Sequence, residues 1–159
     1  MSTTPEKQSP HVHGFPIKQI VLAVNLSARS ENTVAYAIAI ARSFGARIHL
    51  AYAPAPPWSS ESSPHGGHEY LEEKSHEPAQ ELTDLCKRTR RIYPNCGADL
   101  GVGNCTDEVS ELARMFDADL IITASHETSF LNSLFNFDQS PKIMHRAPCP
   151  VLVYCDEKN

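Results

Sequence analysis

The sequence lacks the features that mark membrane, secreted and zinc-binding proteins. No apolar run approaches the ~18 residues of a membrane span, and residues 1–16 have no apolar core of the kind found in a secretion signal. The five cysteines are odd in number and include no C-x2-C pair, which argues against a disulfide framework or a zinc knuckle. They are Cys86, Cys96, Cys105, Cys149 and Cys155. We therefore expect a cytoplasmic protein with reduced thiols.

Positive charge is also scarce. Lys and Arg total 14 against 19 Asp and Glu, which gives a formal net charge of −5. The one basic run, 87–91, falls in a segment that we predict to be helical, so its side chains would point to different sides. A solvated helix face explains this run better than a groove that follows nucleic-acid phosphates. We expect neither nucleic acid nor membrane as a partner.

The length and composition fit one domain with a short tail. A chain of 159 residues with 41% apolar residues can bury one core between a sheet and its helices. Residues 1–16 place Pro5, Pro10 and Pro16 among polar residues, a composition typical of disorder. We predict a disordered tail over 1–16 and a single domain over 17–156.

Apolar runs alternate with helical patterns along the domain. Short, partly β-branched runs predict buried strands, and longer segments with capping residues predict helices. The expected strands are 18–25, 47–53, 96–102, 120–124 and 151–154, and the expected helices are 28–44, 69–91, 105–116 and 140–146. This order, βαβαβαβαβ, requires crossovers and predicts an open parallel sheet with helices on both faces.

Two segments are ambiguous. Val34, Tyr36, Ile38 and Ile40 alternate with other residues as in a strand, but the alanine content, the length and a cap at Ser27 or Ser30 favour helix. Pro78 lies within the segment 69–91, where it either kinks the helix or marks the first turn of its better half. We favour the second alternative.

Three segments then resemble the universal stress protein family. They are Ile20–Asn25 with the following Ser27, the start of the fourth strand at Ala118–Ile122, and His145–Val153 with its A-P-C-P-V run. The resemblance covers nearly all of the chain from residue 17 and implies a Rossmann-like fold with the strand order 3-2-1-4-5. It also implies a homodimer that pairs the last strand with its copy, through Val151, Leu152, Val153 and Tyr154.

The resemblance also implies where a nucleotide would bind. Members that bind ATP carry an Asp after strand one and a G-x2-G-x9-G-[S/T] loop after strand four. In this chain the Asp position falls on Asn25, and the four loop positions fall on Ala124, Glu127, Phe137 and Asp138, with Ser125 beside the first. Carboxylates would repel phosphate, and a phenylalanine would obstruct the close backbone approach that glycine allows. We therefore expect no bound ATP.

Other readings stay open. Asn25 either contacts a nucleobase or ribose, or holds the first turn of the next helix. His126 and Glu127 could act as acid and base in a small hydrolase, although a polar loop explains them better. The segment Phe130–Phe137 could fill the vacated cleft, dock on a partner or pack on the sheet.

Histidines and a cysteine receive structural interpretations. His65, His68 and His76 lie in Gly-rich sequence without a fixed geometry, so we expect no metal site there. Cys149 precedes a buried strand, where a small thiol packs easily. We therefore expect a non-enzymatic stress-response or signalling protein that forms dimers and lacks ATP. The alternatives are a nucleotide-binding member with an altered loop and the small hydrolase.

Overall fold

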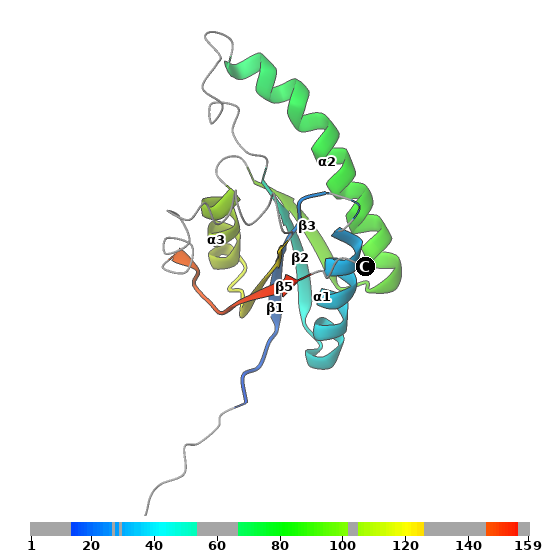
Figure 1. Cartoon of the computed structure of the whole chain (residues 1–159), viewed down its shortest axis with the longest axis vertical. Coiled ribbons are helices and arrows are strands. Elements are labelled where there is room, and N and C mark those ends of the chain that lie inside the picture. Colours follow the sequence, from blue (N-terminus) through cyan, green and yellow to red (C-terminus); the bar gives the residue numbers. More distant parts are fainter. Residues whose placement is uncertain are drawn as a thin grey trace, which may run out of the picture.

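The computed structural model describes residues 14–26, 28, 30–53, 67–101, 105–125 and 146–155. Its elements, drawn in Figure 1, are β1 (Gln19–Ala23), α1 (Ser30–Phe44), β2 (Arg47–Tyr52), α2 (Gly67–Ile92), β3 (Cys96–Leu100), α3 (Cys105–Met115), β4 (Leu120–Ser125) and β5 (Val151–Cys155). The predicted fourth helix, 140–146, lies outside the described residues except for Arg146. No helix of the described part is long and apolar enough to cross a membrane.

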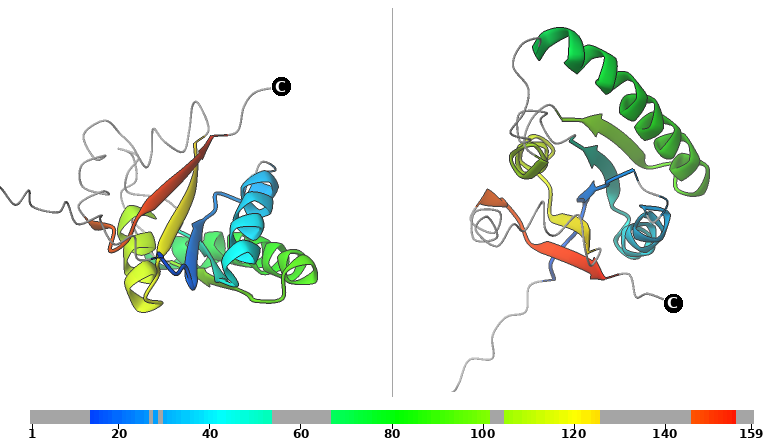
Figure 2. Two further views of the ribbon diagram at one scale, coloured as in Figure 1. Left: turned by 90° about the horizontal axis from the view of Figure 1, so that it is seen from below. Right: turned by 45° about the horizontal axis from the view of Figure 1, so that its top comes forward.

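The strands form one sheet in the order β3-β2-β1-β4-β5, and every pair is parallel. Helices α1 and α2 cover one face and α3 lies against the other (Figure 2). This arrangement confirms the predicted fold class, an open five-stranded Rossmann-like sheet. It also confirms the strand order that the resemblance implied.

The core consists of two apolar layers that share the central strand β1. Ile20 and Leu22 point into the layer beneath α1 and α2, whereas Val21 and Ala23 point into the layer beneath α3. Because successive side chains of a strand alternate between faces, a strand covered on both sides must be continuously apolar. Burying each large aliphatic side chain stabilises the fold by about 1.5–3 kcal/mol.

Helix α1 resolves the ambiguity of its sequence in favour of helix. Ala37 and Ala41 are fully buried, so their methyl groups let the helix lie close to the sheet. The helix ends before Gly45, whose φ of 69° is the left-handed conformation that glycine adopts at little cost. The start differs slightly from the predicted one, since α1 begins at Ser30 and not at residue 28.

Pro78 does not mark the first turn of a helix, so the favoured prediction is wrong. It lies inside α2, which runs from Gly67 to Ile92. Proline removes one backbone donor and crowds the carbonyl one turn before it. A helix of 26 residues retains its other hydrogen bonds, and the half that follows Pro78 gains stability by burying Leu82 and Leu85.

Candidate functional site

In folds of this kind, ligands bind beyond the carboxyl ends of the strands, and here the relevant strands are β1 and β4. From β1 the chain proceeds to β2 on one side, while β4 is the neighbour on the other side. The sheet therefore reverses its order here, which opens a crevice outside the strand ends. The register pairs Leu22 with Ile122, so Asn25 lies level with the end of β4, near Ala124 and Ser125.

Asn25 is tied to the start of α1. The Ser30 hydroxyl donates a hydrogen bond of 2.8 Å to Asn25 Oδ1, and Ser30 itself is buried. Leu26, between them, has a φ of 57°, an uncommon value for a residue with a branched side chain. The oxygen that could have contacted a nucleoside thus binds the first turn of α1, which agrees with the structural alternative. Ser30 donates to Asn25, and the predicted alternative cap, Ser27, lies outside the described residues.

Ala124, the residue before the end of β4, is buried, with 6% of its surface exposed. The family resemblance aligns it with the first glycine of the phosphate loop. A glycine would leave the backbone more accessible there than alanine does. The other predicted loop positions, Glu127, Phe137 and Asp138, lie outside the described residues, as does His126.

Two buried threonine hydroxyls lie on α1 and β4, the elements that flank the crevice. Thr33 is in the first turns of α1, and Thr123 is on β4, on the face that α3 covers. Neither Oγ1 has a hydrogen-bond partner among the residues that the structure describes. Because a buried hydroxyl without a partner costs about 1–3 kcal/mol, these groups are candidates to bind water or a ligand atom.

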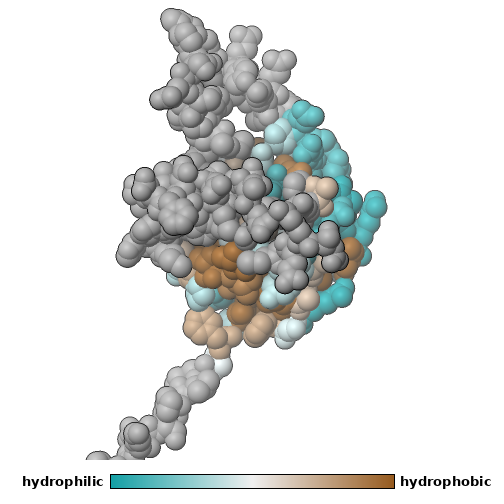
Figure 3. All heavy atoms as spheres, in the orientation of Figure 1, coloured by the Kyte–Doolittle hydropathy of each residue, from teal (hydrophilic) through white to brown (hydrophobic). Residues whose placement is uncertain are grey.

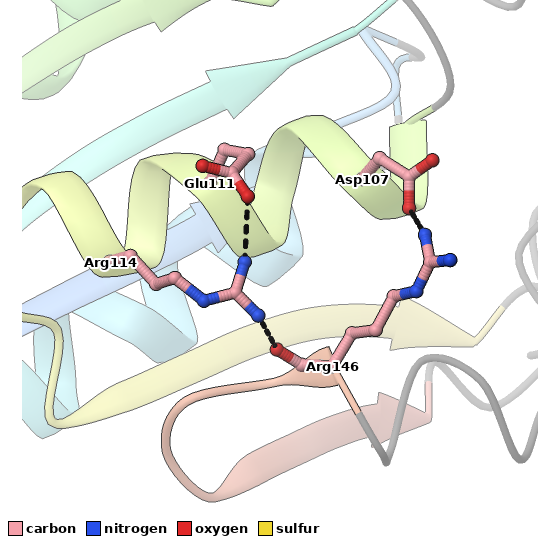
Figure 4. A network of polar contacts seen from close by, with 4 residues as sticks. All are labelled: Asp107, Glu111, Arg114 and Arg146. Carbon is pink, nitrogen blue, oxygen red and sulfur yellow. Dashed lines mark hydrogen bonds and ion pairs between the residues drawn. The ribbon is translucent and has the colours of Figure 1, made fainter.

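A network of two arginines holds the approach to β5 against α3 (Figure 4). The Arg146 guanidinium donates to Asp107 Oδ1, and the Arg146 carbonyl accepts a 2.5 Å hydrogen bond from Arg114 Nη2. Arg114 Nη1 also lies 2.8 Å from Glu111 Oε1. Both guanidinium groups are thereby engaged with oxygen atoms of the protein, and the chain beyond Arg146 is fixed where it enters the sheet.

Strand β5 is an edge strand, and it carries the residues predicted for the dimer contact. Val153 is 40% exposed, whereas Val151, Leu152 and Tyr154 are half-buried. The Tyr154 ring lies against Tyr36 of α1 with 4.9 Å between ring centroids. In Figure 3 hydrophobic surface gathers at the lower centre of the view, over the region of β5.

His49 is a buried polar residue that the sequence reasoning missed. Its ring stacks on Phe116 with centroids 3.8 Å apart, and Nε2 lies 3.0 Å from Gln19 Oε1. Burial lowers the pKa of His49, and Arg47 lowers it further, while Asp99 raises it. The alternation around it, R-I-H-L-A, could have indicated this inward position, because Ile48 and Leu50 point to the opposite face.

The thiols with described side chains are structural. Cys86 and Cys96 are buried, and Cys149 is half-buried. Burial and the neighbouring Cys86 raise the pKa of Cys96 to about 12, and burial also raises the pKa of Cys149. Because the thiolate is the reactive form, Cys96 and Cys149 are poor nucleophiles.

No group of three or more potential metal ligands occurs among the residues whose side chains are described. The side chains of His65, His68 and His76 are outside that part of the chain.

Comparison with known proteins agrees with this architecture. The sequence profile of the universal stress protein family matches residues 16–154. A Thermus aquaticus protein, named as the universal stress protein in the QAH/OAS sulfhydrylase 3′ region, is 30% identical over 147 residues, covering 86% of this chain and 97% of the relative.

Solved structures show the same fold. A universal stress protein in complex with cAMP has a TM-score of 0.64 and 18% identity, covering 89% of this chain and 99% of that one. An Arabidopsis thaliana universal stress protein family protein with AMP bound has a TM-score of 0.59 and 16% identity, covering 88% of this chain and 92% of the other. Sequence profile, relative and fold agree, and the chain belongs to the universal stress protein family.

Proposed function

We propose that this protein is a non-enzymatic stress-response or signalling module that acts as a homodimer and through protein contacts, without ATP held in the manner of its relatives. The observation that carries the proposal is the hydrogen bond from Ser30 to Asn25 Oδ1. It occupies the acceptor that stands in place of the family's aspartate. An internal donor at 2.8 Å leaves that oxygen less able to accept from a nucleoside.

The end of β4 supports the same conclusion. The Ala124 methyl is packed where the family loop begins with glycine. The substitutions at Glu127, Phe137 and Asp138 add two carboxylates and a large ring to the sequence of that loop. Phosphate loops of this type need backbone N–H groups close to the phosphate oxygens and a local positive potential. At these positions Glu127 and Asp138 oppose a positive potential, and the bulk of Phe137 disfavours a close approach of phosphate to the backbone.

The edge position of β5 supports dimerisation. An edge strand presents unpaired backbone donors and acceptors, and pairing with a second copy satisfies them. A two-fold axis beside β5 would bring its four predicted contact residues against their copies and cover Val153. The half-buried apolar residues of β5 provide the burial that such an interface needs.

A second candidate function is nucleotide binding through a modified site. The proteins compared above include complexes with cAMP and AMP, which are smaller than ATP and carry a single phosphate. The hydroxyls of Thr33 and Thr123, which have no partner among the described residues, are the specific observation in its favour. The two hydroxyls belong to opposite faces of the sheet, so a ligand that paired with either one would relieve the cost of burying that hydroxyl alone.

The test is a search for nucleotide in the purified protein. Freshly purified protein would be denatured and the supernatant analysed by chromatography, and the emptied protein would be titrated with Mg-ATP, AMP and cAMP by calorimetry. We expect neither stoichiometric nucleotide nor heat of binding, and no ligand-dependent rise in Tm of the kind that linkage requires. Binding of AMP or cAMP alone would establish the second candidate, and binding of ATP would overturn the proposal.

The variant Asn25→Asp sharpens this test. It restores the family's carboxylate while leaving an acceptor for the Ser30 hydroxyl. If the substituted loop prevents binding, this variant also fails to bind Mg-ATP. If Asn25→Asp alone confers binding of Mg-ATP, residue 25 determines whether ATP binds, and the substituted loop does not prevent binding.

A further inference from the structure

A groove runs between α1 and α2 on the outer side of the sheet. These helices cover the same face, and in Figure 2 their axes cross at an angle. The groove has a volume of about 430 Å³ and is lined in its central part by Val34, Ala35, Ile38, Leu85, Thr89 and Ile92. A second hollow continues it toward Leu26 and Ala28, and both share Glu31, Leu85 and Arg88. It is therefore one continuous groove, whose upper end reaches Leu26, next to Asn25 at the carboxyl end of β1.

The central part of the groove is apolar. Val34, Ile38 and Leu85 form its floor, each at least nine-tenths buried by its own neighbours. Ile92 stands at the lower end with 59% of its surface exposed, and Ala35 lies exposed on the wall. An occupant with apolar side chains would gain by covering Ile92, and the small Ala35 side chain would let its backbone approach.

The upper end of the groove is acidic. Its lining holds the carboxylates of Glu31, Glu81 and Asp84 and a single guanidinium, that of Arg88. Arg88 Nε lies 3.9 Å from Glu31, and Lys87 reaches Asp84 at 3.5 Å from outside the lining. Glu81 has no ion-pair partner within the described part of the chain. Negative charge exceeds positive charge here, so an occupant should bring Lys or Arg to this end.

The lower end has a different character. Arg42 Nη2 donates a 3.0 Å hydrogen bond to the Ile92 carbonyl, which joins the last turns of α1 and α2. The groove thus changes from acidic beside Glu31 to apolar with a cationic rim beside Ile92. A groove between two helices, polarised in this way along its length, fits a third helix with a charge gradient along its own axis.

We propose that this groove binds an amphipathic helix of a partner protein, with apolar side chains at i, i+3 or i+4 and i+7, and with Lys or Arg at the end beside Glu81. The inference rests on the proposed function in one respect, since both assume that the protein acts by binding a partner protein. It does not depend on nucleotide binding or on the β5 dimer.

The experiment uses labelled model helices as probes. A fluorescein-labelled Leu/Lys amphipathic peptide of ~18 residues, about five turns, would be compared with a Leu/Glu peptide of the same pattern and with a scrambled Leu/Lys peptide. Binding to the full-length protein would be followed by fluorescence anisotropy. We expect the Leu/Lys helix to bind with a Kd in the micromolar range, at least about tenfold tighter than either control peptide.

Variants locate the binding. Ala35→Trp fills the groove from an exposed position, and we expect it to weaken binding at least about tenfold. The matched control is Ala39→Trp, because Ala39 is exposed on the same helix and does not line the groove. Glu81→Lys should weaken the Leu/Lys peptide and strengthen the Leu/Glu peptide. Circular dichroism melts would verify that each variant is folded.

Three results would overturn the proposal. One is equal binding of the Leu/Lys, Leu/Glu and scrambled peptides, and another is unchanged binding by Ala35→Trp. The third is self-association of the free protein that Ala35→Trp abolishes, which would assign the groove to a second copy of this chain. Because the peptide assay needs neither nucleotide nor β5, its failure would leave the nucleotide and dimer results standing.

Discussion

At the scale of single residues, His49 shows how a buried polar ring is accommodated in an apolar sheet. Its two nitrogen atoms face Gln19 and Asp99, and its ring face packs on Phe116. The amide oxygen of Gln19, 3.0 Å from Nε2, accepts a hydrogen bond from a neutral ring in the tautomer protonated at Nε2. This cluster lies away from the carboxyl ends of β1 and β4, where ligands would bind.

The lowered pKa of His49 predicts that stability falls in mild acid. Below its ordinary pKa of about 6.5, this histidine takes up a proton more readily in the unfolded chain than in the folded one, so acid favours unfolding. The stability that the neutral ring contributes is full above that pH and is lost as pH falls toward the folded-state pKa.

Urea unfolding at about pH 7.5 and about pH 5.5 checks this expectation. The chain has eight histidines, so the wild-type profile must be compared with that of His49→Gln. The variant should lose less stability between the two pH values, because glutamine does not titrate. Parallel profiles for the two proteins would contradict the assignment.

The contacts of single residues were the hardest feature to predict from the sequence. Asn25 could be placed after a buried strand, and both of its readings could be named. The donor that distinguishes them, Ser30, depends on the left-handed turn at Leu26, and no sequence signal for that turn exists, since leucine rarely adopts it. His49 was missed because a single histidine in an apolar run carries no periodicity of its own.

At the scale of elements, the Arg114 and Arg146 network adds polar contacts between α3 and the approach to β5 to the apolar packing of Cys149 and Val151. Arg114→Ala removes the donor to the Arg146 carbonyl together with the contact to Glu111. We expect it to destabilise the protein by about 1 kcal/mol, since hydrogen bonds from charged donors are among the stronger ones but this one is exposed to solvent. Asp107→Asn should cost less, because it retains a neutral acceptor for Arg146.

Thermal or urea unfolding measures both effects. Arg91→Ala is a suitable control, because Arg91 is exposed at the end of α2 and has no hydrogen bond or ion pair among the described residues. If Arg114→Ala costs no more than this control, the network does not hold the approach to β5.

Elements were predicted well where one signal dominated. The five strands and the helices 28–44 and 105–116 agree with the structure to within a few residues. The interpretation of Pro78 failed because a single proline removes only one backbone donor, and α2 continues on both sides of it from Gly67 to Ile92.

At the scale of the whole molecule, the parallel sheet followed from the alternation of strands and helices, but its strand order came from the family resemblance. Apolar periodicity shows which segments are buried, and it cannot say which buried strands are neighbours. The predicted dimer contact also came from the family resemblance. Strand β5 can be recognised as an edge strand only once the order β3-β2-β1-β4-β5 is known.

The proposed homodimer leads to a prediction at this scale. Val153→Lys places a charge on the exposed part of β5, and we expect it to convert dimers into monomers in sedimentation equilibrium. Met115→Lys is the matched control, because Met115 is a 70% exposed apolar residue on α3, and this variant should remain dimeric. A wild-type protein that is monomeric at all concentrations, or a dimeric Val153→Lys, would contradict the proposed interface.

The central place of β1 has a consequence for synthesis on the ribosome. Strand β1 pairs on one side with β2 and on the other side with β4, which follows much later in the chain. The Lys18 N–H also binds the carboxylate of Asp119, which is 101 residues away. A nascent chain can therefore assemble β1, β2 and β3 early, while one edge of β1 stays open until β4 has left the exit tunnel. Because an open apolar edge recruits other chains, the chain is most exposed to misassembly in that interval.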